Sequence, residues 1–120
     1  MARILIIDDN ETMREGMATT VRRMGHEVVT AASGADGLER LRKQGADFVV
    51  TDLKMEGVGG LEVAKAVKEL DPACPVLIVT AHSAVEVFEK SRARGATACF
   101  DKVSFVPRIP MVLARYCPAA

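Results

Sequence analysis

An uninterrupted apolar run at Phe48–Val50 is the feature that most constrains the fold of this chain. The run has no polar alternation and consists of residues that favour extended backbone, which indicates a strand buried on both faces. Strands of this kind belong to parallel sheets that are covered by helices. The strand ends in Asp52, and ligands of open α/β sheets bind just outside the carboxyl ends of the strands. Asp52 is therefore the first candidate for a chemical role.

Further extended segments alternate with helical patterns along the whole chain. Strands are expected at residues 3–7, 27–32, 48–52, 76–79 and 96–101. Helices are expected after Asn10, after Ser33, after the glycine-rich loop at 56–60 and after Ser83, with a short last helix near residues 107–116. The third helix is expected to carry Val63, Val67 and Leu70, and Pro107 and Pro110 are expected near the start of the last one. This alternation predicts an α/β fold, a single doubly wound five-stranded parallel sheet with five helices, in one domain over residues 1–120.

Composition excludes several classes of partner. The 16 basic residues balance the 16 acidic ones, so no global field favours nucleic acid or an anionic membrane. The three cysteines, Cys74, Cys99 and Cys117, show no metal-ligand spacing and predict free thiols in a reducing compartment. No signal-peptide pattern opens the chain, and no apolar run approaches the roughly 18–20 residues that span a bilayer. We therefore expect a cytoplasmic domain that contacts neither nucleic acid nor membrane directly.

Four of the expected strands end in residues whose side chains could bind a ligand or take part in a reaction. These residues are Asp8 and Asp9, Asp52, Thr80 and Lys102. Three carboxylates at one edge repel each other unless a cation neutralises them, and a hard divalent ion such as Mg²⁺ suits an all-oxygen site. A lysine binds phosphate as a point charge, and a threonine hydroxyl can donate to a phosphoryl oxygen. Each residue alone also has an ordinary interpretation, as a helix cap, a strand residue or a solvated lysine. Together they form a set of groups suited to moving a phosphoryl group onto a carboxylate.

The motifs at these strand ends resemble the receiver domain of two-component response regulators. The resemblance covers about residues 1–105 and implies the flavodoxin-like strand order 2-1-3-4-5. The run at 80–83 is similar to receivers of nitrogen-regulation-type transcriptional activators. The residues that carry the resemblance are Ile4–Asp9, Thr51–Met55 with Gly60, Val79–Ser83, and Gly95 and Ala96 before Lys102.

The resemblance assigns roles to individual residues. It implies that Asp52 accepts a phosphoryl group from the phosphohistidine of a histidine kinase or phosphotransfer protein. It also implies that Asp8, Asp9, Asp52 and the backbone carbonyl of Lys54 hold Mg²⁺.

The remaining positions of the motif concern the bound phosphoryl group and the output. By the same resemblance Thr80 and Lys102 grip the phosphoryl oxygens, and Lys54 and His82 tune the rate of dephosphorylation. The family's partners are a downstream protein or effector domain, and a homodimer through the fourth helix, fifth strand and fifth helix is possible. Receivers are signalling domains that assist their own phosphorylation and dephosphorylation, so no separate enzymatic activity is expected.

Three positions depart from the family pattern. Glu56 and Val103 stand where the family usually has proline, and Cys99 stands where it has an aromatic switch residue. The family's second proline commonly follows a cis peptide bond, which before Val103 would cost about 2.5–4 kcal/mol. These departures concern the output mechanism more than the phosphoacceptor chemistry.

Three other functional hypotheses fit part of the pattern. A phosphohydrolase with an aspartate nucleophile usually carries Asp-x-Asp at the first strand, which the sequence at 8–10 does not match. A flavodoxin-like electron carrier needs a phosphate-binding loop after the first strand, where this chain has two acids. A degenerate receiver that binds partners without phosphorylation is suggested by Cys99 and Val103.

Overall fold

The computed structural model describes residues 1–81 and 84–117, without the side chains of 84–87. Its five strands are all parallel and form one sheet in the order β2-β1-β3-β4-β5. The predicted fold class and strand order are therefore confirmed. The strands are β1 Arg3–Ile7, β2 Glu27–Ala31, β3 Phe48–Asp52, β4 Val76–Thr80 and β5 Ala98–Asp101. The helices are α1 Glu11–Arg23, α2 Gly34–Gln44, α3 Gly60–Leu70, α4 Ala84–Arg92 and α5 Lys102–Tyr116.

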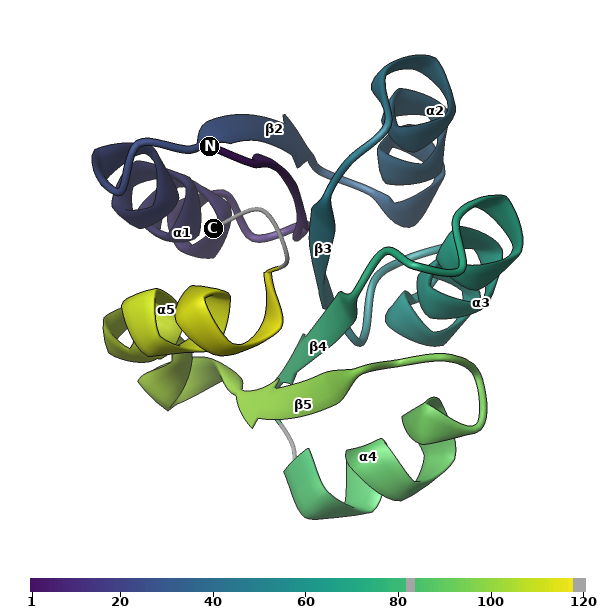
Figure 1. Cartoon of the computed structure of the whole chain (residues 1–120). Coiled ribbons are helices and arrows are strands. Elements are labelled where there is room, and N and C mark those ends of the chain that lie inside the picture. Colours follow the sequence, from purple (N-terminus) through teal and green to yellow (C-terminus); the bar gives the residue numbers. More distant parts are fainter. Residues whose placement is uncertain (82–83, 118–120) are drawn as a thin grey trace.

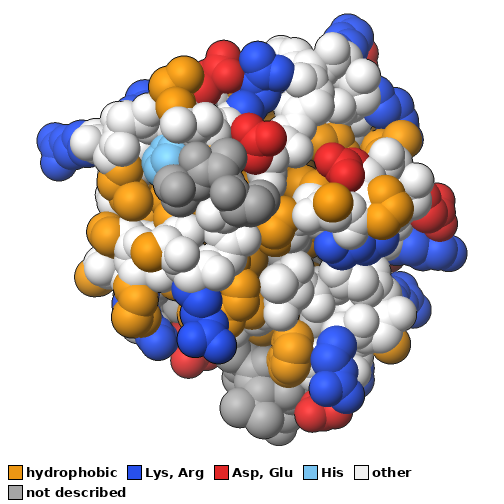
Figure 2. Space-filling view, viewed as in Figure 1, with side chains coloured by type: hydrophobic (Ala, Val, Ile, Leu, Met, Phe, Trp, Pro, Cys, Tyr) orange, Lys and Arg blue, Asp and Glu red, His pale blue; other side chains and the backbone are white. Residues whose placement is uncertain are grey.

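The helices cover the sheet in two layers. Helices α1 and α5 lie on one face, and α2 and α3 lie on the other (Figure 1). Helix α4 packs against β5 and β4 at the edge of the sheet. Among the described residues, no helix is long and apolar enough to cross a membrane. Basic and acidic side chains are interspersed on the face seen in Figure 2, in keeping with a formal net charge of zero.

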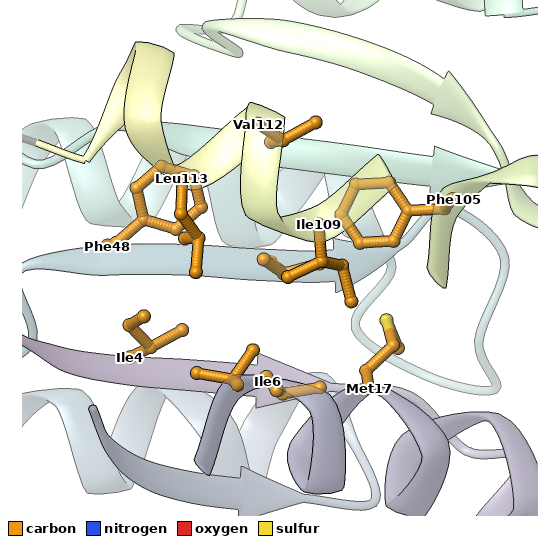
Figure 3. A pocket seen from close by; sticks show the side chains of 10 residues that line it. Ile4, Ile6, Met17, Phe48, Phe105, Ile109, Val112 and Leu113 are labelled. Carbon is orange, nitrogen blue, oxygen red and sulfur yellow. The ribbon is translucent and has the colours of Figure 1, made fainter. Parts of the chain in front are cut away.

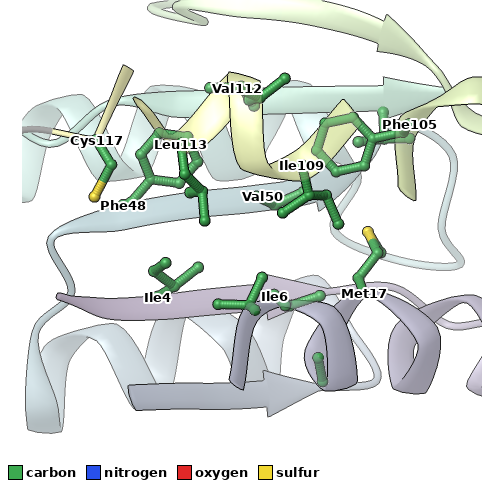
Figure 4. Packing of buried hydrophobic residues seen from close by; sticks show 14 of the residues in the cluster. Ile4, Ile6, Met17, Phe48, Val50, Phe105, Ile109, Val112, Leu113 and Cys117 are labelled. Carbon is green, nitrogen blue, oxygen red and sulfur yellow. The ribbon is translucent and has the colours of Figure 1, made fainter. Parts of the chain in front are cut away.

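The central strands are buried as their composition predicts. Every residue of β3 and β4 is buried, whereas the edge strand β2 is mostly half-exposed. The larger core lies between the sheet and the layer of α1 and α5, where Phe48 faces side chains of α5 (Figure 4). A cavity of about 10 Å³ remains between these side chains (Figure 3). Its lining is entirely apolar and its volume is at the lower limit for one water molecule, so it is a packing gap and not a ligand site.

Polar side chains start the first two helices at the predicted residues. Asn10 accepts a hydrogen bond from the backbone N–H of Met13 at 2.9 Å, and Ser33 accepts one from Asp36 at 3.1 Å. Each bond satisfies a donor that the first turn of a helix leaves without a backbone partner. The capping pattern predicted at Ser83 lies outside the described residues.

The last helix differs from its prediction. Instead of a short helix near residue 107, α5 begins at Lys102 directly after β5 and is the longest helix in the described part of the chain, with 15 residues. Phe105 extends the apolar face of the helix one turn towards its start, because it lies four residues before Ile109 and is buried with it. Pro107 and Pro110 lie inside the helix on its exposed side, so their rings disturb no core contact.

Two smaller differences concern the third helix and the fifth strand. Leu70 continues the apolar pattern of Val63 and Val67, but it is the last residue of α3 and is 48% exposed. The fifth strand begins at Ala98 and not at residue 96, since the N–H of Ala96 donates a hydrogen bond back to the carbonyl of Ser91 in the last turn of α4.

The prolines of α5 lead to a stability prediction. Pro110 has no N–H to donate to the carbonyl of Val106 four residues earlier. Pro110→Ala restores this donor on an exposed site, and we expect the free energy of unfolding to rise by about 1–2 kcal/mol in urea titrations. The matched control is Met111→Ala, which changes the next exposed residue and should stay within about 0.5 kcal/mol of wild type. A Pro110→Ala protein no more stable than this control would contradict the interpretation.

Candidate functional site

Three carboxylates meet at the carboxyl edge of the sheet. Asp8 follows β1 and Asp52 ends β3, and these two strands are neighbours in the sheet. Oxygen atoms of Asp8, Asp9 and Asp52 all lie within 4.8 Å of one another. Asp8 is fully buried and Asp52 is 8% exposed, whereas Asp9 is open to solvent. The topology therefore brings together the acidic residues that the sequence placed at strand ends.

Lys102 connects the acidic residues to α5. Its Nζ lies 3.2 Å from Oδ2 of Asp8 and 3.3 Å from Oδ2 of Asp52. The peptide bond between Lys102 and Val103 is trans, so the lysine reaches the site without a cis bond. Partial burial alone would lower the pKa of Lys102, but the two carboxylates outweigh this effect and raise its pKa above the ordinary value. Lys102 therefore stays charged and joins β1, β3 and α5 at one point.

Negative charge is in excess at this edge. Burial, followed by repulsion from Asp8, raises the pKa of Asp52, and Lys102 only partly opposes this shift. Oδ2 of Asp8 is buried and has no hydrogen-bond partner among the described residues, although it faces the charge of Lys102. An unsatisfied buried carboxylate oxygen beside two further carboxylates fits the oxygen ligands that Mg²⁺ prefers. The donor set is therefore suited to a hard divalent cation.

The loop after β3 folds back tightly over the strand end. The N–H of Gly60 donates to the carbonyl of Leu53 at 2.8 Å. A Cβ atom on Gly60 would lie 2.5 Å from the carbonyl oxygen of Asp52, which is closer than real Cβ contacts occur. Only glycine allows this approach, so the glycine-rich loop fixes the end of β3 against the start of α3.

Two further residues predicted from the sequence, Thr80 and Lys54, lie in different surroundings. Thr80 ends β4 and is buried, one residue beyond the ladder partner of Asp52. Lys54 is exposed in the loop that follows Asp52. The structure thus gathers Thr80 and Lys102 near Asp52, while Lys54 lies on the surface. His82 lies outside the described residues.

Cys99 is a half-buried residue of β5. Its Sγ lies 3.1 Å from the hydroxyl of Ser91, a fully buried residue of α4. Burial raises the pKa of the Cys99 thiol, against the opposing effect of the Ser91 hydrogen bond. The position therefore carries a protonated thiol that links α4 to β5.

Two contacts at Asp8 were not anticipated from the sequence. The N–H of Asn10 donates to Oδ1 of Asp8 at 2.9 Å, and Nη1 of Arg14 donates to the backbone carbonyl of Asp8, also at 2.9 Å. Arg14 stands four residues after Asn10 in α1, and helical side chains lean towards the N-terminus of their helix. That spacing is the signal that could have indicated Arg14.

The raised pKa of Asp52 leads to a prediction on stability and pH. Above the folded-state pKa the ionised carboxylate destabilises the folded protein, so Asp52→Asn should raise the free energy of unfolding of the metal-free protein near pH 7 by roughly 1 kcal/mol. The gain should shrink as the pH falls through the raised pKa and vanish below the ordinary value of 3.8, where the folded and unfolded states both hold the proton. Urea titrations at about pH 7 and about pH 4 measure this difference. Asp101→Asn, at an exposed residue of β5, is the control, and an equal gain there would refute the explanation.

Comparisons with known proteins agree with this geometry. A family model described as the response regulator receiver domain matches residues 4–110. A response regulator receiver protein from Anaeromyxobacter sp. (strain Fw109-5) is 37% identical over 109 residues, and the chain covers 46% of its length. Sporulation initiation phosphotransferase F from Bacillus subtilis is 29% identical over 97% of this chain and 94% of its own length. The structure of the chemotaxis protein CheY4 from Vibrio cholerae has a TM-score of 0.89 at 30% identity and covers 97% of this chain and 98% of its own.

These matches confirm the resemblance that the strand-end motifs indicated. The matched region contains β2 to β5 in full, all of β1 except Arg3, and the three carboxylates at the carboxyl edge of the sheet. It ends within α5. Receiver domains are signalling domains of two-component systems. The chain belongs to the response regulator receiver domain family.

Proposed function

We propose that this chain, over residues 1–120, is a phosphoacceptor that receives a phosphoryl group on Asp52 from the phosphohistidine of a histidine kinase or phosphotransfer protein. An oxygen of the ionised Asp52 attacks phosphorus, the bond from phosphorus to the histidine nitrogen breaks, and its electron pair stays on the imidazole. The observation that carries the proposal is the contact of Lys102 with both Asp8 and Asp52, in which the buried Oδ2 of Asp8 has the charge of Lys102 beside it but no hydrogen bond. No separate catalytic base is needed, because the nucleophile is already a carboxylate.

The acidic residues would hold the metal ion that this transfer requires. The carboxylates of Asp8, Asp9 and Asp52 and the backbone carbonyl of Lys54 are the proposed ligands of Mg²⁺. When bound, Mg²⁺ would neutralise charge on the phosphoryl oxygens. The unsatisfied oxygen of Asp8 and the all-oxygen donor set support this assignment.

Lys102 and Thr80 have proposed roles after the transfer. Lys102 contacts Asp52 in the unphosphorylated protein, and it would bind a phosphoryl oxygen once Asp52 is esterified. Thr80 ends the neighbouring strand, from which its hydroxyl could donate to a second phosphoryl oxygen. Lys54, exposed beside the site, and His82 are the proposed positions that tune dephosphorylation by flanking the approach of water.

The output surface is proposed to be the face formed by α4, β5 and α5. Lys102 is the first residue of α5, so a change in its contacts acts directly on that helix. The proposed partners are a downstream protein or effector domain, or a second copy of the chain. The contacts of Lys102 with both carboxylates argue against a receiver that works without phosphorylation.

Acetyl phosphate tests the phosphoacceptor role. Wild-type protein incubated with acetyl phosphate and Mg²⁺ should gain the mass of one phosphoryl group by intact-mass spectrometry, because the reagent supplies an activated phosphoryl group. Excess EDTA should prevent this gain, and Asp52→Asn should abolish it. Asp101→Asn serves as the matched control and should be labelled like wild type. Equal labelling of the Asp52→Asn protein would refute the assignment of the phosphoacceptor.

A further inference from the structure

Arg14 contacts the acidic site without belonging to it. This partly buried residue of α1 donates from Nη1 to the backbone carbonyl of Asp8 at 2.9 Å. We propose that Arg14 is a positioning residue, which fixes the peptide between Asp8 and Asp9 and thereby sets the two carboxylates for binding a divalent cation. The inference rests on the cation site of the proposed function and adds a residue outside the ligand set.

The Asp8 carbonyl needs a donor because the sheet ends beside it. The N–H of Asp8 makes the last bond of the ladder, to the carbonyl of Ala31 at 3.1 Å. Ala31 is the final residue of β2, so the strand does not continue alongside the Asp8 carbonyl. A buried carbonyl without a partner is costly, and the guanidinium of Arg14 supplies the hydrogen bond. This contact fixes the chain where β1 passes into the turn before α1.

The peptide that Arg14 holds carries both acidic residues. A peptide unit is planar, so a hydrogen bond to its oxygen restrains the Cα atoms of Asp8 and Asp9 together. The carboxylate of Asp8 is also held by Asn10 and Lys102. Asp9 is exposed, and no hydrogen bond or ion pair holds its carboxylate within the described ranges 1–81 and 84–117. The direction of Asp9 therefore depends on the backbone, and thus on Arg14.

The positive charge of Arg14 and its proposed positioning role have opposite effects on the affinity for a divalent cation. The direction in which this affinity changes when Arg14 is replaced therefore tests the inference. A positive guanidinium near three carboxylates repels a divalent cation, so removing the charge alone should tighten cation binding. Removing a group that orients metal ligands should weaken binding instead, typically by about 10- to 100-fold. Arginine suits such a role because its planar group presents several donors in a fixed geometry.

The experiment compares Mg²⁺ affinity in matched variants. Wild type, Arg14→Met, Arg14→Lys and Arg23→Met are melted in EDTA and in increasing MgCl₂ at constant ionic strength, and the rise in Tm gives the dissociation constant. Arg23→Met removes the same charge from the exposed far end of α1 and should bind Mg²⁺ within about twofold of wild type. Arg14→Met should bind about tenfold more weakly. Arg14→Lys, which keeps the charge without the planar group, should lie between them.

The metal-free state provides a second readout. In ¹H–¹⁵N spectra without metal, the amide signals of Asp9 and Asn10 should shift in Arg14→Met and stay in place in Arg23→Met. Unchanged signals, or Mg²⁺ binding by Arg14→Met as tight as or tighter than that of wild type, would overturn the role of Arg14. If wild type itself shows no stabilisation by Mg²⁺, the proposed cation site fails and this inference fails with it.

Discussion

The ion pairs from Lys102 to Asp8 and Asp52 are the interaction on which the arrangement of side chains at the carboxyl edge of the sheet depends. Parallel strands carry two buried carboxylates to neighbouring strand ends, and Asp9 adds a third charge within 4.8 Å. Lys102 offsets part of this charge at 3.2 and 3.3 Å, from the first residue of the last helix. The remaining excess of negative charge is the physical reason to expect a divalent cation, and it makes the site sensitive to added phosphoryl charge.

The rest of the fold holds these groups in place. The two hydrophobic cores fix β1 and β3 side by side, so that the positions of Asp8 and Asp52 follow from packing. The close approach of Gly60 restrains the end of β3, and Arg14 restrains the end of β1. Helix α5 starts at Lys102 and buries Phe105 and further apolar residues along one face. A displacement of the lysine is thereby coupled to the packing of a whole helix.

Sequence reasoning predicted the strands and the acidic edge because both follow from local patterns. The apolar run at Phe48–Val50 predicted a buried strand, and parallel alternation then placed Asp52 at the same edge as Asp8. The extent of α5 was not predicted, because prolines usually mark helix starts and their exposure on the outer side depends on tertiary packing. The contacts of Arg14 and Ser91 were missed for a similar reason, since they depend on the direction of side chains across different elements.

The most direct test of this account is to locate the phosphoryl group on the chain. Protein phosphorylated with acetyl phosphate and Mg²⁺ would be reduced with borohydride, which converts an aspartyl phosphate into homoserine, and then digested and sequenced by mass spectrometry. We expect homoserine at position 52 alone, because Asp52 combines burial, the Lys102 contact and a place at the end of the central strand. Homoserine at position 8 or 9, or none in protein that carries the added mass, would contradict the account.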